Sequence, residues 1–234
     1  MFKKKESALK FGGDDVNVPA STSSPHLGKK EPTQLKNHTK KYAVAMKLIK
    51  GFDLSDINAK INLSIAEKIE LSQALLNAYQ TQINNLNMVH RDIKPPNIKV
   101  EYVEGKSIVN FIDYDNYTLE GTMPQQNINS PGFTPPEGLG GTASYAQDIY
   151  SLGKVLNQLW TRELRNNHLS SETGIVINAI DNMIQEMTMK EPGQRVTIED
   201  LNKKMNDIHF DNPIDNTEEQ IRKLNNARRY ENSQ

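Results

Sequence analysis

The residues with the clearest chemical potential form one short segment, His90-Arg91-Asp92-Ile93-Lys94-Pro95-Pro96-Asn97. It combines a carboxylate, an ammonium group and a side-chain amide. A carboxylate can orient or deprotonate a hydroxyl, a lysine can neutralise a transferring phosphoryl group, and an amide oxygen can ligate magnesium. Asp113 follows directly after an apolar run, where a phosphate-bound magnesium would find a second hard oxygen ligand. The pattern therefore indicates phosphoryl transfer assisted by a divalent metal.

A helix before this polar segment and a hairpin after it are expected to position it. Ser64 and Glu67 have the spacing of a capping box, and the helix that they begin keeps one face apolar. Residues 98–103 and 107–112 are predicted to be two strands joined by Glu104-Gly105-Lys106. The apolar face of the helix consists of Ile65, Ile69, Leu75, Leu76, Tyr79, Ile83 and Leu86.

The second half of the chain is predicted to be helical. Residues 113–143 are rich in Pro, Gly, Asn and Thr and are expected to form a long ordered loop. Ser144 and Gln147 form a second capping box, and Thr197 can cap a later helix. Between them, apolar spacing predicts a further helix that ends before Pro192-Gly193. Trp160 and the apolar positions of these helices are expected to form the core.

The polar segment resembles the catalytic loop of Ser/Thr protein kinases, His-Arg-Asp-x-Lys-x-x-Asn, and fills every fixed position. The resemblance implies that Asp92 is the catalytic base, that Lys94 contacts the γ-phosphate of ATP and that Asn97 holds a magnesium ion. His90 is expected to pack beneath the loop as a structural residue. Asp113-Tyr114-Asp115 resembles the Asp-Phe-Gly motif, which implies that Asp113 is the other metal ligand, with Asp115 replacing the glycine.

Further motifs resemble the same family in the same order. Residues 130–137 resemble the end of a kinase activation segment, with Ser130 at the substrate-facing position and Thr134 in the same segment. Asp148 matches the helix aspartate that braces the catalytic loop, and Arg195 matches the arginine that pairs with Glu137.

Two roles remain open for Arg91. It can bind a phosphorylated residue of the activation segment, for which Thr118 and Thr122 are the candidates, or it can simply contact the backbone.

The nucleotide side is assigned from the apolar run Tyr42–Ile49, which predicts a buried strand ended by Gly51 and resembles the strand leading into the kinase hinge. Met46 then resembles the gatekeeper and Asp53 a ribose contact. No Gly-x-Gly-x-x-Gly occurs in the chain, so the N-terminal lobe is expected to be reduced. The resemblance implies nucleotide binding by Met46, Lys47, Leu48, Ile49, Asp53, Lys94 and Asn97.

The expected fold is α+β and mainly helical: a kinase-like C-terminal lobe with small hairpins and a minimal N-terminal lobe. Residues 1–40 are expected to be poorly ordered or a residual part of the N-terminal lobe. Residues 41–210 are expected to form the hinge and C-terminal lobe, and residues 211–234 a charged helical tail.

Composition excludes several classes of protein. Hydrophobic residues make up 36% of the 234-residue chain and charged residues 24%, which suffices for a core. The absence of cysteine excludes disulfides, cysteine zinc sites and thiol catalysis. A net charge of −1 gives no reason to expect nucleic acid or an anionic membrane as partner. Neither a signal peptide nor a membrane-spanning run is evident, so a cytoplasmic location is expected, or a host cytosol for a secreted effector.

The resemblance implies a Ser/Thr protein kinase that uses ATP with magnesium, or manganese in its place, on a protein substrate. One alternative is a pseudokinase or kinase fragment that acts as a protein-binding module. Another is a small kinase of the bacterial-effector type that requires an activating partner protein. A chain that starts at an internal methionine would also explain the short N-terminal part.

Overall fold

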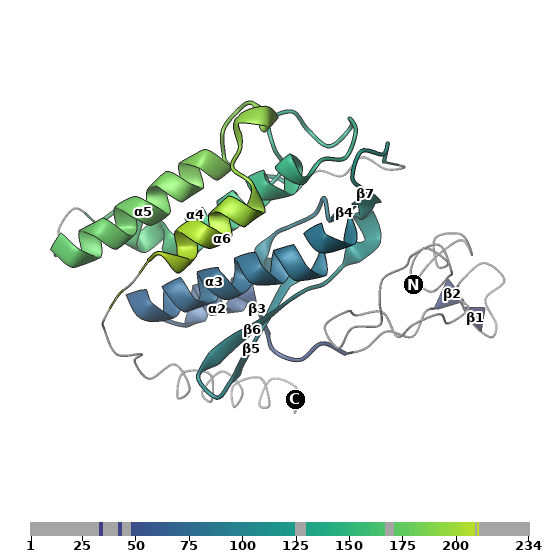
Figure 1. Ribbon diagram of the computed structural model, residues 1–234. Coiled ribbons are helices and arrows are strands. Elements are labelled where there is room, and N and C mark those ends of the chain that lie inside the picture. Colours follow the sequence, from purple (N-terminus) through teal and green to yellow (C-terminus); the bar gives the residue numbers. More distant parts are fainter. Residues whose placement is uncertain are drawn as a thin grey trace.

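The structure is a computed structural model that describes residues 33–34, 42–43, 48–124, 130–166, 171–208 and 210. The described part is mainly helical and carries small antiparallel sheets, which confirms the predicted α+β class (Figure 1). None of the helices in these ranges is both long enough and apolar enough to cross a membrane.

Helix α3 (Ile65–Gln82) lies at the centre of the fold, between the β-hairpin and the later helices (Figure 1). It begins with the predicted capping box: the Glu67 N–H donates to Ser64 Oγ at 3.3 Å, and the Ser64 N–H donates to Glu67 Oε2 at 2.7 Å. Both bonds satisfy backbone donors that the first turn of a helix otherwise leaves unpaired.

The predicted hairpin consists of β5 (Ile98–Val103) and β6 (Lys106–Phe111). Val103 pairs with Lys106, so the turn contains two residues rather than the expected three, and Lys106 belongs to the strand. The turn residues Glu104 and Gly105 have φ angles of 51° and 75°, as a tight hairpin with left-handed central residues requires. Strand β3 (Phe52–Asp53) pairs with β5 on its other side.

Side chains of α3 cover the outer edge of β6. Gln82 donates from Nε2 to the Val109 carbonyl at 2.8 Å and accepts from the Phe111 N–H at 3.0 Å. Glu70 accepts from the Ser107 N–H at 2.7 Å. These bonds occupy backbone groups that would otherwise offer an edge to another strand. They also fix the hairpin, and with it the end of the polar segment, against the central helix.

The later helices occur where they were predicted. Helix α4 (Tyr145–Leu164) begins with the capping box of Ser144 and Gln147. Helix α5 (Ser171–Met187) follows, and α6 (Ile198–Asn206) is capped by the Thr197 hydroxyl, which accepts from the Asp200 N–H.

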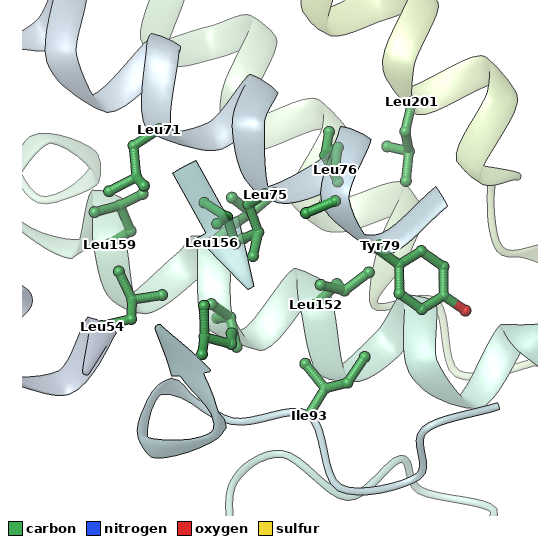
Figure 2. Close-up of a cluster of buried hydrophobic side chains, with 14 of the residues drawn as sticks. Leu54, Leu71, Leu75, Leu76, Tyr79, Ile93, Leu152, Leu156, Leu159 and Leu201 are labelled. Carbon is green, nitrogen blue, oxygen red and sulfur yellow. The ribbon is translucent and has the colours of Figure 1, made fainter. Parts of the chain in front are cut away.

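The main core lies between α3, α4 and α6, and Trp160 is fully buried in it, as predicted. Figure 2 shows leucines of α3 and α4 in contact across this core, with Leu201 contributed by α6 and Ile93 by the polar segment. The buried Ile93 therefore anchors the polar segment from below.

The predicted strand Tyr42–Ile49 is wrong in its length. Strand β2 comprises Tyr42–Ala43 and pairs with β1 (Thr33–Gln34), while residues 48–50 have no regular structure and residues 44–47 lie outside the described ranges. An apolar run does not by itself set the length of a strand, because a strand extends only where it has a partner.

Helix α2 (Leu54–Lys60) was not predicted, although it buries Leu54 and Ile57 at helical spacing. It has seven residues, too few for the periodicity to stand out from the flanking loop.

The expected loop 113–143 contains some regular structure among its described residues. Strand β7 (Thr118–Leu119) pairs antiparallel with β4 (Met88–Val89), which immediately precedes the polar segment. This pairing holds the polar segment His90–Asn97 next to the stretch of chain that contains Asp113. Single 3-10 turns occur at Asn84–Leu86, Pro95–Asn97, Tyr114–Asn116 and Pro192–Gln194.

Candidate active site

Asp92 lies at the centre of the site, and its side chain is 5% exposed. Its Oδ2 accepts hydrogen bonds from Lys94 Nζ at 2.8 Å and from Asn97 Nδ2 at 3.1 Å. Its Oδ1 accepts from the Ser130 hydroxyl at 2.5 Å. Lys94 Nζ also lies 3.2 Å from Ser130 Oγ. Lys94 and Asn97 thus orient the Asp92 carboxylate through Oδ2, and its Oδ1 is hydrogen-bonded to the Ser130 hydroxyl. Proton transfer from a hydroxyl requires such a contact.

The backbone of the polar segment is held in an unusual shape. Arg91 has φ 67°, a left-handed conformation that costs a non-glycine residue about 1–3 kcal/mol. Pro95 and Pro96 begin a 3-10 turn closed by the Asn97 N–H, which donates to the Lys94 carbonyl at 2.9 Å. Asn97 Nδ2 donates back to the Asp92 carbonyl, also at 2.9 Å. The Asp92 carboxylate and the Asn97 amide are thereby held next to each other.

Asp148 on α4 stabilises this shape from beneath. Its two carboxylate oxygens accept the backbone N–H groups of His90 at 2.6 Å and of Arg91 at 2.8 Å, and Tyr79 donates to it at 3.4 Å. Complete burial raises the pKa of Asp148 to about 7, while the two backbone bonds act in the opposite direction. The position of the left-handed residue therefore depends on one buried side chain.

His90 is fully buried and packs beneath the loop, with its ring centroid 4.9 Å from that of Tyr114. Its Nδ1 accepts from the Asp92 N–H at 3.3 Å, so the ring proton lies on Nε2, which donates to the Ile112 carbonyl at 3.1 Å. Burial lowers the pKa of His90, which favours this neutral form. Both nitrogens are occupied in positioning the Asp92 backbone and the chain before Asp113.

Arg91 is 3% exposed and contacts the backbone of the activation segment. It donates to the Leu139 carbonyl at 2.7 Å, and its Nη1 lies 3.4 Å from the Asn116 carbonyl and 3.4 Å from the Thr118 hydroxyl. Of the two roles that the sequence left open for Arg91, the structure shows the contact with the backbone. Carbonyl acceptors carry no sequence signal, so Leu139 and Asn116 could not be found in advance.

Glu137 and Arg195 form a bidentate ion pair, with both N–O distances at 2.7 Å. The Arg195 side chain is 1% exposed and that of Glu137 is 26% exposed, so the pair is half-buried. Arg195 also donates to three backbone carbonyls, those of Ala146, Met189 and Lys190. The pair ties the segment after Ser130 to the helices of the core.

The backbone around Ser130 is also fixed by local hydrogen bonds near the Asp92 carboxylate. The Thr134 hydroxyl accepts from the Ser130 N–H at 2.9 Å and lies 3.1 Å from the Ser130 carbonyl. These local bonds fix the backbone that presents Ser130 Oγ to Asp92.

Asp113 and Asn97 offer two oxygen ligands on adjacent backbone. The Ile112 N–H donates to the Asn97 carbonyl at 2.9 Å, which places Asp113 one residue from that contact. Asp113 is exposed, has φ 62°, and its carboxylate accepts no hydrogen bond from the described residues. Because Asn97 donates to Asp92 through Nδ2, its Oδ1 remains for a metal. The donor set fits magnesium, which prefers carboxylate and amide oxygens.

No group of three His, Asp or Glu side chains in the described ranges could bind a metal by itself. The remaining positions around a magnesium at Asp113 and Asn97 would have to be filled by phosphate and water oxygens, as is usual for this ion.

A family model of the protein kinase domain matches residues 31–210. The chain belongs to the protein kinase family. Its curated relatives carry names of serine/threonine kinases, so the chain is Ser/Thr-kinase-like.

The serine/threonine-protein kinase PrkC of Bacillus subtilis is 29% identical over 187 residues, which covers 68% of this chain and 28% of that protein. R436 of Acanthamoeba polyphaga mimivirus, assigned by name as a serine/threonine-protein kinase, is 25% identical over 245 residues, which covers 91% of this chain and 83% of that protein. PknA of a Nostoc strain is 34% identical over 88 residues, or 34% of this chain and 15% of that protein. The chain thus spans less than a third of the bacterial kinases that it matches.

The nucleotide side of this kinase-family chain is described only in part. Met46 and Lys47 lie outside the described ranges; Leu48 is 87% exposed and Ile49 is half-buried. Asp53 forms an ion pair with Lys99 at 2.7 Å and lies opposite it in the sheet, two positions beyond Asn97. The sheet therefore brings Asp53 near Asn97. Lys99 was not singled out from the sequence, because only the strand register reveals the pair.

Proposed function

We propose that this chain transfers the γ-phosphate of ATP to serine or threonine hydroxyls of a protein, with magnesium bound at Asp113 and Asn97. The observation that carries the proposal is the environment of the Ser130 hydroxyl. It donates to Asp92 at 2.5 Å and lies 3.2 Å from Lys94 Nζ. A substrate hydroxyl beside the same two groups would have a base for its proton and a cation for the incoming phosphoryl group.

The proposed reaction is a direct displacement. The substrate hydroxyl oxygen forms a bond to the γ-phosphorus, and the bond from that phosphorus to the bridging oxygen of ADP breaks. The hydroxyl proton passes to Asp92, whose orientation is fixed by Asn97 and Lys94. Lys94, whose Nζ lies 3.2 Å from Ser130 Oγ, would place its positive charge beside a substrate oxygen in the same environment. Bound magnesium, or manganese in its place, would neutralise the charge of the phosphates.

Two arguments favour a serine or threonine substrate. The Lys94 position resembles Ser/Thr kinases in sequence, and the relatives carry that substrate class in their names. We assign the ribose contact to Asp53 and the adenine contact to residues 46–49, from the same resemblance. A bound ribose would then compete with Lys99 for the Asp53 carboxylate.

The proposal is tested by transfer of labelled γ-phosphate to the chain itself and to generic protein substrates, with magnesium or manganese. Asp92→Asn removes the base and Asp113→Asn removes the negative charge of a metal ligand, and each should lower transfer by about 10²-fold or more. Asp115→Asn is the matched control, because it neutralises an exposed carboxylate two residues from Asp113. The control should retain transfer within about threefold, inside the usual scatter of a surface substitution.

The alternative of a protein-binding module rests on the missing Gly-x-Gly-x-x-Gly motif, which normally cradles the triphosphate. Wild-type transfer no greater than that of Asp92→Asn, at high enzyme and nucleotide, would overturn the proposal in favour of this alternative. Nucleotide binding with and without magnesium would then separate a nucleotide-binding pseudokinase from a module that binds none.

A further inference from the structure

A cleft of about 560 Å³ lies on a part of the fold that the active site does not use. It is lined by the end of α2 and the residues after it (58–63), by Lys68 on α3, and by the last turns of α4. None of the residues assigned to phosphoryl transfer lines it. A cleft of this size accommodates several residues of an extended peptide or a small ligand.

The charged side chains that line the cleft are all positive: Lys60, Lys68, Arg162 and Arg165. Two of them are neutralised, because Lys60 pairs with Asp56 at 3.3 Å and Lys68 pairs with Glu163. Arg162 donates instead to the neutral Asn62 Oδ1, and Arg165 makes no ion pair with the described residues. Neither guanidinium group therefore has an anionic partner within the described part of the chain, which favours an anionic occupant of the cleft.

We propose that the cleft binds an acidic peptide segment, and that its occupant is residues 211–219 of this chain. This segment, Asp211-Asn212-Pro213-Ile214-Asp215-Asn216-Thr217-Glu218-Glu219, contains four carboxylates and no lysine or arginine. Its carboxylates complement Arg162 and Arg165. The inference does not depend on phosphoryl transfer.

The chain leaves α6 within reach of the cleft. Gln73 on α3 donates to the Met205 carbonyl at 3.3 Å, near the end of α6. Lys68 precedes Gln73 by five residues, or about 7.5 Å along the helix axis. The Ile208 N–H donates to the Met205 carbonyl and closes the turn after α6, and the three residues from Ile208 to Asp211 can span about 10 Å when extended. Because the segment is tethered, even weak contacts would hold it at a high effective concentration.

The absence of cysteine in the natural chain permits a direct test by crosslinking in the full chain. The test variant combines Ala59→Cys with Glu218→Cys, and the control variant combines Lys190→Cys with Glu218→Cys. Ala59 and Lys190 are both exposed, and the ten residues from Ile208 to Glu218, about 34 Å long when extended, let an undocked segment reach either position. Only Ala59 lines the cleft.

Docking predicts that the intramolecular disulfide forms at least about tenfold faster in the test variant than in the control variant. Adding Arg165→Glu, or raising sodium chloride to about 0.5 M, should bring the test rate down to the control rate because the attraction is electrostatic. Equal rates in the two variants would overturn the proposal, as would a fast rate that neither change reduces. Disulfides formed between two molecules rather than within one would overturn the assignment of the occupant.

Discussion

The polar segment His90–Asn97 and the hinge-side segment Leu48–Asp53 bind the two reactants in the proposed function, yet they are built in opposite ways. In the polar segment His90, Arg91, Asp92 and Asn97 are all buried, and each makes hydrogen bonds within the protein. In the hinge-side segment Leu48 is 87% exposed, and the one ion pair, between Asp53 and Lys99, is partly exposed.

The difference teaches that Asp92 and the residues that support it are held in place by the helical core. Asp148, Tyr79 and Ile93 connect the polar segment to α3 and α4, so its geometry is as stable as the core itself. The hinge-side segment depends on a two-residue strand, β3, and on the close approach of Gly51 to β5. Damage to the first region should therefore cost both stability and catalysis, and damage to the second mainly nucleotide binding.

The largest effect is expected for Asp148→Ala, which removes the side chain that holds the backbone of the polar segment. It leaves the buried N–H groups of His90 and Arg91 without acceptors, and should lower the free energy of unfolding by about 3 kcal/mol. Urea unfolding measures this loss, and phosphate transfer should fall with it. Asp181→Ala is the control, because Asp181 accepts only an exposed bond from Gln185 and should change stability by less than about 0.5 kcal/mol. Similar small losses in both variants would contradict the role given to Asp148.

Gly51→Ala tests the hinge-side segment. Gly51 has φ 102°, and an added Cβ would lie 2.4 Å from the Val100 carbonyl oxygen, so β3 must move away from β5. A loss of about 2–3 kcal/mol is expected, with weaker ATP binding measured by calorimetry. Gly105→Ala is the matched control: it shares a positive φ of 75° but meets no atom within 4 Å, and should cost only about 1 kcal/mol. Equal costs would show that backbone conformation, rather than the contact with β5, determines the effect.

Gly153→Ala probes the core away from both regions. Its Cβ would lie 2.7 Å from Thr188 Cγ2 and 2.8 Å from Met187 Cβ, so α4 and α5 must separate, at a cost of about 1–2 kcal/mol. Gly174→Ala, in helix α5 with no atom within 4 Å, should instead stabilise by about 0.5–1 kcal/mol. Thermal unfolding distinguishes the two. Phosphate transfer by folded Gly153→Ala protein should stay near the wild-type rate. A loss of transfer as large as that of Asp148→Ala would show that the polar segment is no more sensitive than the rest of the core.

The smallest effect concerns pH. Because burial lowers the pKa of His90, the unfolded chain takes up a proton below about pH 6.5 that the folded chain does not, and His90 reduces stability as pH falls through that value. Asp148, with its pKa raised to about 7, acts in the opposite sense: between about pH 4 and 7 the folded state binds a proton that the unfolded state does not. The two slopes offset each other near pH 6.

A site-resolved measurement is therefore needed. Nitrogen NMR at pH 6 should show His90 as the neutral Nε2–H tautomer, while an ordinary histidine is about three-quarters protonated. A charged His90 at that pH would contradict the hydrogen bond from the Asp92 N–H to Nδ1.

The sequence revealed the parts of the site that depend on residue type at short spacing. The capping boxes of Ser64 and Ser144 and the two-strand hairpin are local, so a few neighbouring residues determine them. The polar segment stood out because Asp92, Lys94 and Asn97 bring a carboxylate, an ammonium group and an amide together within a few residues.

The features that the sequence did not reveal depend on tertiary contacts. Lys99 meets Asp53 only because of the β3–β5 register, and Gln82 covers β6 only because α3 packs beside that strand. The Leu139 carbonyl that holds Arg91 is a backbone group, which every residue offers. The strand expected over Tyr42–Ile49 was overestimated because hydrophobicity alone does not show where a pairing partner ends.

The most direct test of the account measures Mg·ATP binding and phosphate transfer together on the wild type, Asp92→Asn and Asp113→Asn. The account predicts that Asp92→Asn binds Mg·ATP within about threefold of the wild type but transfers phosphate about 10²-fold more slowly or worse. Asp113→Asn should lose both, because it removes the negative charge of a metal ligand. Transfer by Asp92→Asn at the wild-type rate would contradict the assignment of Asp92 as the group that accepts the substrate proton.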